Sequence, residues 1–291
     1  MTAPGRNGQI DLAFARVAGS GTPTGPGTRT ALRCYAHRAP LQLGRILYPD
    51  ESCPDMAYAH VAMIAGGLVE GDCLMQRVEV DAGARAHVTT LSATKVYRAT
   101  GGHVAQRIEL RAAAGGVLEW WPEPVIAFRG ARFQQAVELQ AHSEAVLLYG
   151  DLLLPGRTGE RHDYAAYSSR VTACSGDGAL LFVDTQALAP TPFGRRALRD
   201  TLPADRQVIG TVFVLARAAG TDLLAALRAE LGAVEGTLPV LAGCSLLPGE
   251  AGVVVRLLAA DGNAGRAALA AIRRVTRREL LHAGTAAPRK L

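Results

Sequence analysis

Residues 78–90 carry the pattern that decides the fold: Val78-Glu79-Val80 leads through a turn of small residues to Val88-Thr89-Thr90. Apolar–polar alternation with a period of two places one side of the chain in a core and the other in water, which favours a strand over a helix. The pattern recurs three more times. The four copies begin at Val78, Ile108, Val137 and Val171, which are 30, 29 and 34 positions apart.

A repeat of about 30 residues indicates stacked β-layers in which each layer covers the apolar face of the next. An antiparallel meander whose hairpins resemble each other by chance is the alternative. Two amphipathic helices are predicted in the C-terminal half, one from Asp222 to Gly232 and one from Asp261 or Asn263 to Gly284. The expected fold is therefore mainly β, with layered, β-helix-like strands and two C-terminal-half α-helices.

Length and composition limit the class of protein. The chain has 291 residues, enough for one large β domain or two smaller ones, and 49% of them are apolar. Residues 1–9 and 286–291 are expected to be disordered, and the Gly- and Pro-rich stretch 19–28 is expected to be a mobile loop.

Charge and cysteine usage point to a cytoplasmic protein. The net charge is only +5, and the basic run Arg273-Arg274 with Arg277-Arg278 is interpreted as a solvated or partner-facing helix surface rather than a nucleic-acid site. Five cysteines without a C-x-x-C pair favour reduced thiols. We find no signal-peptide stretch and no apolar run of about 20 residues, so no membrane partner is expected.

Motifs that carry chemistry are scarce. The sequence has no G-x-S-x-G, no H-E-x-x-H and no cysteine pair for a metal. Carboxylates at predicted strand ends and turns remain, with two histidines near them in sequence. They are either solvated turn residues and internal ion pairs, or weak, exchangeable ligands for a divalent ion that passes along the protein. These residues are Asp72, Glu123, Asp151, Glu160 and Asp163, with His60 and His162.

The segment from Gly66 to Asp72 is glycine-rich but does not predict a phosphate-binding loop. It lacks the lysine of G-x-x-x-x-G-K-[ST], and a strand pattern follows it instead of a helix. We interpret it as a glycine-lined bend between two strands that lets another backbone approach closely and leaves the Asp72 carboxylate at the rim of the sheet.

These segments together resemble the urease accessory protein UreD (UreH) family, in the family's order from about Ile10 into the last helix. The pairing of the Gly-Gly…Gly-Asp string with Ala-Thr-Lys-Val-Tyr-Arg is specific. The residues that carry the resemblance are Pro40-Leu41 with Tyr48-Pro49, Gly66-Gly67-Leu68-Val69-Glu70-Gly71-Asp72, Thr89-Thr90 with Ala93-Thr94-Lys95-Val96-Tyr97-Arg98, Leu118-Glu119-Trp120 with Pro122-Glu123 and Ile126-Ala127-Phe128-Arg129-Gly130-Ala131, and Gly156-Arg157 with Gly159-Glu160.

The resemblance implies a single UreD-like domain over residues 1–291 and a scaffold role without catalysis. Members of the family bind apo-urease and the accessory protein UreF, which recruits the GTPase UreG. They are thought to guide nickel through an internal passage lined with polar residues. By position, Asp72, Glu123 and Glu160 match the family's acidic positions, and His60 completes the set of candidate nickel ligands. No tightly bound cofactor is implied, only transient nickel.

The chain also departs from the family pattern. Glu70 stands where the family has glycine, which adds a carboxylate beside Asp72, and the prolines expected after His60 are missing. Two other functions therefore stay open. One is a carbohydrate-active β-solenoid enzyme, which would need clustered acids and exposed aromatics, although aromatic residues make up only 5% of the chain. The other is an interaction module with no metal role.

Overall fold

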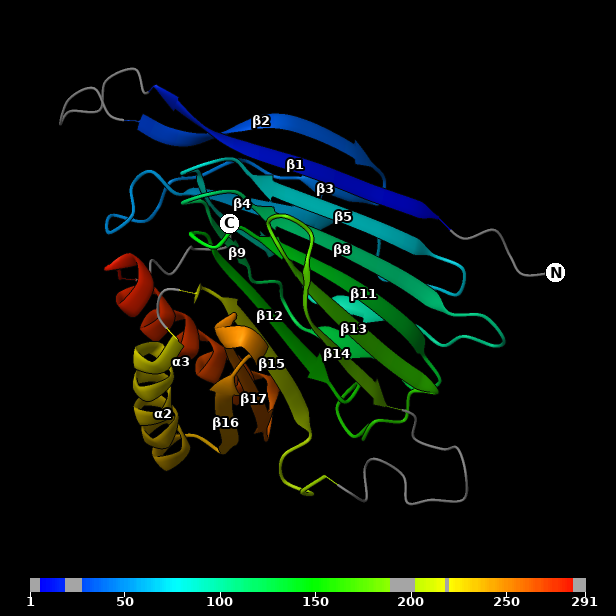
Figure 1. Cartoon of the computed structure of the whole chain (residues 1–291). Coiled ribbons are helices and arrows are strands. Elements are labelled where there is room, and N and C mark those ends of the chain that lie inside the picture. Colours follow the sequence, from blue (N-terminus) through cyan, green and yellow to red (C-terminus); the bar gives the residue numbers. More distant parts are fainter. Residues whose placement is uncertain (1–5, 19–27, 189–201, 218–219, 285–291) are drawn as a thin grey trace.

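The computed structural model describes residues 6–18, 28–188, 202–217 and 220–284. Strands dominate it, and two long helices follow in the C-terminal part (Figure 1). The strands are β1 Asn7–Ala18, β2 Thr28–Arg38, β3 Leu41–Leu43, β4 Ala57–Met63, β5 Cys73–Val80, β6 Arg85–Thr90, β7 Thr94–Val96, β8 Val104–Ala112, β9 Val117–Trp120, β10 Val125–Ala127, β11 Arg132–Ala141, β12 Val146–Leu154, β13 Ala166–Ser175, β14 Leu180–Leu188, β15 Val208–Leu215, β16 Val240–Leu246 and β17 Gly252–Ala259. The helices are α2 Gly220–Thr237 and α3 Gly262–Leu281.

The repeats form a β-solenoid of about four turns. The first sheet has the order β14-β13-β11-β8-β5-β1-β2, and within it β5, β8, β11 and β13 pair in parallel. The second sheet contains β4, β6, β9 and β12, which also pair in parallel before β15, β17 and β16 extend it. The short strands β7 and β10 make a third side. Parallel pairing from one turn to the next excludes the meander and confirms the layered fold.

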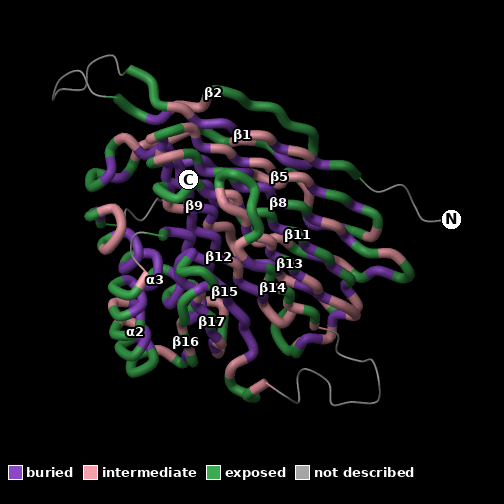
Figure 2. The backbone as a smooth tube through the Cα atoms, viewed as in Figure 1, coloured by how far each residue is buried: buried purple, intermediate pink, exposed green. Residues whose placement is uncertain are grey.

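The register places equivalent side chains above one another. Val88 of β6 pairs with Trp120 of β9, and Trp120 pairs with Tyr149 of β12, so these three buried residues form one row inside the solenoid. Val78 pairs with Leu110, two positions beyond the Ile108 that the sequence repeat matched to it. Because side chains alternate with a period of two, an offset of two keeps the same face inward. Figure 2 shows the resulting buried interior between the two sheets.

The two helices cover the outer face of the second sheet. Their apolar stripes, which include Leu227 and Ile272, pack against Leu152 and Val212 in a second core outside the solenoid. The Asp261 side chain caps α3 by accepting hydrogen bonds from the backbone N–H groups of Asn263 and Ala264. Among the described residues, no helix combines the length and the apolarity needed to cross a lipid bilayer.

Several expected boundaries were wrong. Residues 7–9 belong to β1, because Asn7 and Gly8 pair with Cys73 and Leu74 of β5. The helix expected to end at Gly232 continues to Thr237, since its buried stripe extends from Leu231 to Val234. The rest of the expected disordered or mobile stretches, residues 1–5, 19–27 and 286–291, lies outside the described residues, whereas Thr28 begins β2.

Substitution of one glycine in the second sheet tests how closely its strands approach each other. A Cβ at Gly252, whose φ is 144°, would lie 1.9 Å from the carbonyl oxygen of Val214. Gly252→Ala should therefore lower the free energy of unfolding by at least about 2 kcal/mol, because the backbone must shift in a paired strand. Gly243→Ala on β16 is the control, since its Cβ would meet no atom within 4 Å. Equal urea-unfolding midpoints for the two variants would contradict this close approach.

Candidate functional site

A column of polar side chains crosses the interior of the solenoid. Gln106 of β8, Gln135 of β11 and Ser169 of β13 lie in register on the first sheet, and all three are buried. Gln106 Nε2 donates to Gln135 Oε1 at 3.1 Å, and Gln135 Nε2 lies 3.1 Å from Ser169 Oγ. Each turn of the solenoid thus adds one polar group to a row that runs across the strands.

The column reaches the second sheet at Asp151 of β12. Asp151 Oδ2 accepts a hydrogen bond from Gln135 Nε2 at 2.9 Å and from the hydroxyls of Tyr149 and Tyr167 at 3.3 Å each. Burial raises the pKa of Asp151 because it disfavours the charged form, although these donors oppose the shift. We call the six residues Gln106, Gln135, Ser169, Tyr149, Asp151 and Tyr167 the polar column.

A small void adjoins the other end of the column. This cavity of about 20 Å³ is lined by the polar residues Gln76, Thr90, Ser92, Thr94 and Gln106 and by four apolar residues. The Oε1 atoms of Gln76 and Gln106 are buried and accept no hydrogen bond from any described residue. A cavity of this size has room for one water, which would satisfy both oxygens.

Asp72 is buried rather than at an exposed rim. Its side chain accepts hydrogen bonds from the backbone N–H groups of Arg6 and Val69 and pairs with the Arg6 guanidinium at 2.6 Å. Burial alone would raise the pKa of this carboxyl, but the hydrogen bonds from Arg6 and Val69 outweigh it and hold the pKa below its usual value. Residue Asp72 therefore joins the start of the chain to the bend between β4 and β5.

Glu70, the extra carboxylate that the sequence places next to Asp72, has hydrogen-bond partners of its own. Its carboxylate accepts hydrogen bonds from the backbone N–H groups of Thr100 and Gly102, at 2.6 and 2.5 Å, in the next turn of the solenoid. Those two bonds, with the Thr100 hydroxyl, lower the pKa of Glu70 to about 2. Glu70 thus fastens one glycine-rich loop to another. The expected close approach at Gly67 is confirmed, since a Cβ there would lie 2.9 Å from Lys95 O.

The other candidate ligands lie apart on separate segments. Glu160 accepts hydrogen bonds from the backbone N–H groups of Arg129 and Arg157, both at 3.1 Å. Glu123 lies between β9 and β10, with Oε2 at 3.7 Å from Nη1 of Arg266. His60 is buried on β4. In the part of the chain that the structure describes, no group of three or more His, Cys, Asp or Glu side chains is arranged to hold a metal ion.

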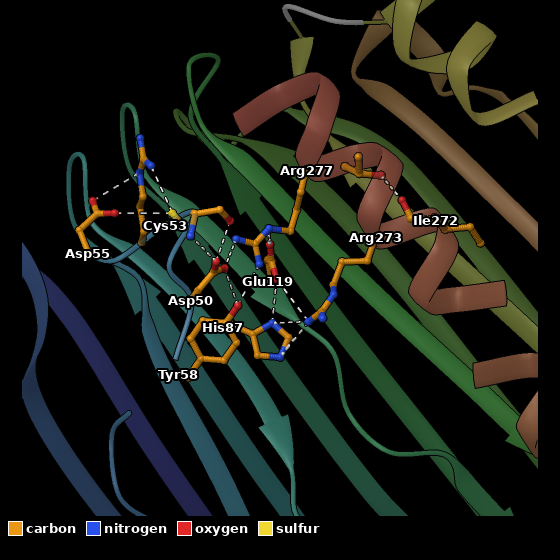
Figure 3. A network of polar contacts seen from close by, with 12 residues as sticks. Asp50, Cys53, Asp55, Tyr58, His87, Glu119, Ile272, Arg273 and Arg277 are labelled. Atoms are coloured by element: carbon orange, nitrogen blue, oxygen red, sulfur yellow. Dashed lines mark hydrogen bonds and ion pairs between the residues drawn. The ribbon is translucent and has the colours of Figure 1, made fainter. Parts of the chain in front are cut away.

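Sequence reasoning missed a buried charged network between the second sheet and α3. Tyr58 of β4, His87 of β6 and Glu119 of β9 lie in register on the outer face of the sheet. Arg273 and Arg277 reach them from α3, as Figure 3 shows. With Asp50, which pairs with Arg277, these residues form what we call the α3 network.

Contacts within the α3 network are close. His87 Nδ1 lies 2.7 Å from Glu119 Oε2, and Arg273 Nη1 lies 3.2 Å from the same nitrogen and 3.3 Å from Nε2. Arg277 Nη1 donates to the Tyr58 hydroxyl at 2.9 Å. Burial lowers the pKa of His87 to about 4, so the imidazole is neutral near pH 7, and two arginines balance the carboxylates of Asp50 and Glu119.

The interpretation of the basic run as a solvated or partner-facing surface was wrong for two of its four arginines. Arg273 and Arg277 are 8% and 0% exposed, whereas Arg274 and Arg278 are exposed. The buried pair is four residues apart, so both side chains lie on the face of α3 that meets the sheet. The four-residue spacing was the only sequence signal that the two arginines share a helix face. Their buried partners lie about 150 or more residues away in sequence, so the sequence did not show what that face meets.

Removing one arginine of the α3 network should lower the stability of the folded protein. Arg277→Met leaves the carboxylates of Asp50 and Glu119 without their main cation, and we expect the free energy of unfolding to fall by about 3–5 kcal/mol. Arg278→Met, one position along and exposed, should change it by less than about 0.5 kcal/mol. Chemical denaturation followed by circular dichroism measures both. A similar loss in the two variants would show that the network does not anchor α3.

Lowering the pH should reduce the free energy of unfolding through His87 of the α3 network, and it should do so in a defined pH range. The folded pKa of His87, about 4, lies below its ordinary value of 6.5, so the stabilisation is complete above 6.5 and is lost as pH falls towards 4. The loss over that range amounts to about 3 kcal/mol. His87→Gln should remove this part of the pH dependence, and the exposed His103→Gln should not. Parallel curves for wild type and His87→Gln would refute the assignment.

Comparison with known proteins gives one consistent result. The family model described as UreD urease accessory protein matches residues 6–290. Urease accessory protein UreD 2 of Streptomyces griseus subsp. griseus is 32% identical over 259 residues, which cover 88% of this chain and 84% of the relative. UreD of Photorhabdus laumondii subsp. laumondii is 30% identical over 282 residues, covering 95% and 84%, and UreD of Cenarchaeum symbiosum is 31% identical over 234 residues, covering 80% and 81%.

The solenoid with its C-terminal helices and the match over nearly the whole chain agree with each other and with the motifs of the sequence. Members of this family are accessory proteins without catalysis of their own. The chain belongs to the UreD urease accessory protein family.

Proposed function

We propose that this chain is a scaffold for urease maturation that binds apo-urease together with UreF-type and UreG-type accessory proteins and helps to deliver nickel to the urease active centre. Membership of the UreD family supports a part in urease maturation without turnover. It also displaces the carbohydrate-active enzyme as an alternative. Nickel is the cargo of this protein in the proposal, bound transiently and passed on.

The polar column is the observation that carries the nickel-delivery part of the proposal. Its possible metal-coordinating groups are amides, hydroxyls and one carboxylate. They line the interior of the solenoid in register from β8 to β13 and continue across to β12. Oxygen ligands of this kind hold a first-row divalent ion loosely compared with thiolates, which suits transfer. The Asp151 carboxylate accepts three hydrogen bonds, so an arriving cation would have to displace these donors.

In the proposal, Asp72, Glu123, Glu160 and His60 act outside the column as further transient contacts for nickel. For Asp72 this requires that Arg6 release the carboxylate, since the guanidinium now occupies both oxygens. For Glu160 it requires exchange of two backbone hydrogen bonds. Asp72 and Glu160 are thus occupied by groups of the chain itself, which nickel would have to displace.

A cytoplasmic location is part of the proposal. All five cysteines are present as free thiols, two of them exposed at Cys34 and Cys73. Free exposed thiols suit a reducing compartment. No nucleic acid or membrane partner is proposed.

Urease activation in co-expressing cells tests the role. Omitting this chain should abolish activation, and activity that stayed unchanged would overturn the proposal. Asp151→Asn and Asp72→Ala should each lower activation roughly tenfold or more, as loss of a metal contact does, while both variants still co-purify with urease subunits. Asp205→Asn, an exposed carboxylate, is the control.

Nickel binding by the purified chain separates delivery from a plain interaction module. Equilibrium dialysis should show weaker nickel binding for Asp151→Asn and Asp72→Ala than for wild type. If wild type and both variants bound nickel equally, and activation followed only complex formation, the chain would be an interaction module without a metal role.

A further inference from the structure

The string Ala93-Thr94-Lys95-Val96-Tyr97-Arg98 has no part in the proposed nickel delivery, yet the structure places it on a surface that three turns of the solenoid build together. Phe128 N–H donates to Val96 O at 3.0 Å and joins the string to the next turn. Gly130 N–H donates to Asp163 O at 2.9 Å and joins that turn to the one after it. The segments involved lie side by side, and we call them the three-turn surface: residues 95–99, 128–131 and 157–163.

Five cations gather on the three-turn surface, and all five residues are exposed. They are Lys95, Arg98, Arg129, Arg157 and Arg161. Among the described residues, only Arg129 of the five has an ion-pair partner, Asp163 at 3.0 Å, and 71% of the Arg129 side chain stays exposed. Most of the positive charge on this surface is therefore not neutralised by a direct contact within the described part of the chain.

The three-turn surface keeps a positive excess after its own carboxylates are counted. Glu160 and Asp163 are the two acidic residues of the three segments, against five cations. Three positive charges remain in excess, whereas the net charge of the whole chain is only +5. Glu70 borders the surface through its bond to Thr100, and the exposed Arg132 at the opposite border offsets its charge. Neighbouring strands lie about 4.8 Å apart, so the first and third turns are separated by about 10 Å. This is about one Debye length at 0.1 M salt, so the fields of the cations add.

Internal contacts hold the third segment of the surface in place before any partner arrives. The Glu160 carboxylate accepts hydrogen bonds from the backbone N–H groups of Arg129 and Arg157, both at 3.1 Å. His162 is 1% exposed, and its Nε2 lies 2.8 Å from Gln207 O. A binding surface that is already ordered loses less conformational entropy when a partner binds.

The two aromatic rings of the surface are engaged within the chain. Arg157 Cζ lies 4.4 Å from the ring centroid of Phe128, and 5.4 Å separates the ring centroids of Phe128 and Tyr97. Tyr97 also covers Gly67, because a Cβ there would lie 2.4 Å from its ring. Single-stranded nucleic acids bind by stacking their bases on free aromatic faces along a basic groove. The engaged rings and the two interspersed carboxylates favour a protein segment as the partner instead.

We propose that the three-turn surface binds an acidic segment of a protein partner, whose glutamate or aspartate side chains pair with Lys95, Arg98 and Arg161. Guanidinium groups and carboxylates match each other as paired donors and acceptors. Exposed charges of this kind act mainly on the rate of association and on the choice of partner. The surface adds to the scaffold role proposed above and depends on it, since a scaffold needs surfaces that bind other proteins. Neither the polar column nor the α3 network contributes to it.

A short peptide that alternates glutamate with serine is the probe, and the same peptide with glutamine in place of glutamate is the neutral comparison. Fluorescence anisotropy with the full wild-type chain at low salt should show binding of the glutamate peptide at least about tenfold tighter than that of the glutamine peptide. Binding should weaken as salt is added, because exposed charges are screened. Equal binding of the two peptides, or no saturable binding of either, would overturn the proposal. Single-stranded DNA that bound more tightly than the glutamate peptide would overturn it in favour of a nucleic acid.

Two triple variants then locate the binding surface. The first combines Lys95→Gln, Arg98→Gln and Arg161→Gln, and it should weaken binding of the glutamate peptide about tenfold, since each exposed pair contributes up to about 1 kcal/mol. The second removes the same charge from exposed arginines on β13, α2 and α3 and should change binding less than about twofold. It combines Arg170→Gln, Arg228→Gln and Arg274→Gln. Equal losses in the two variants would show that only net charge matters and would overturn the proposal.

The peptide assay contains neither urease nor nickel. Failure of the glutamate peptide to bind would therefore leave the urease-activation experiment as it stands. A chain that bound the peptide but did not support urease activation would contradict the scaffold role and not the chemistry of the three-turn surface.

Discussion

Parallel stacking of the solenoid turns is the constraint on which the rest of the structure depends. Each strand of one turn finds its hydrogen-bond partners in the turn before and the turn after, so no turn is complete alone. Because the register is fixed, a side-chain type that recurs at one position becomes a continuous row. Apolar positions give the row Val88, Trp120 and Tyr149, and polar positions give the row Gln106, Gln135 and Ser169.

The two rows have opposite energetic consequences. Burial of the apolar row stabilises the solenoid in proportion to the area removed from water. Burial of amides and a carboxylate is unfavourable unless each polar atom finds a partner. The polar column supplies most of these partners across turns and across the two sheets, but not one for Gln106 Oε1. A polar row inside a β-solenoid therefore has a cost that an apolar row does not, and the proposed nickel delivery offers a functional reason for it.

Outside the solenoid, a second set of buried charges holds α3 in place. Arg277 contacts Asp50, Tyr58 and Glu119, and Arg273 contacts His87 and Glu119. Isolated buried charges are unfavourable, but here two cations meet two carboxylates and a neutral imidazole. The network therefore favours one position of the helix, because any other would leave charges unpaired. A pocket of about 230 Å³ lies beside the network, and Arg266, Leu269 and Arg273 of the same helix line it.

Local rules explain what could be predicted. Period-two alternation in four copies was enough for the layered β fold, the spacing of leucines for the two helices, and the specific strings around Asp72 and Lys95 for the family. Local rules failed for single side chains. Glu70 looked like a neighbour of Asp72, yet its carboxylate is held by backbone N–H groups of the next turn. Arg277 looked solvated, yet it is buried against Asp50, Tyr58 and Glu119, which lie far away in sequence.

Sequence alone thus determined the repeat, the fold class and the family, because these depend on patterns that neighbouring residues carry. Tertiary structure alone decided which polar groups meet: that Asp72 is held by Arg6, that Asp151 ends a buried column, and that Arg273 and Thr89 share a pocket. The physical reason is register. A shift of two residues between turns preserves every apolar face and so leaves the pattern unchanged, but it replaces every cross-turn partner.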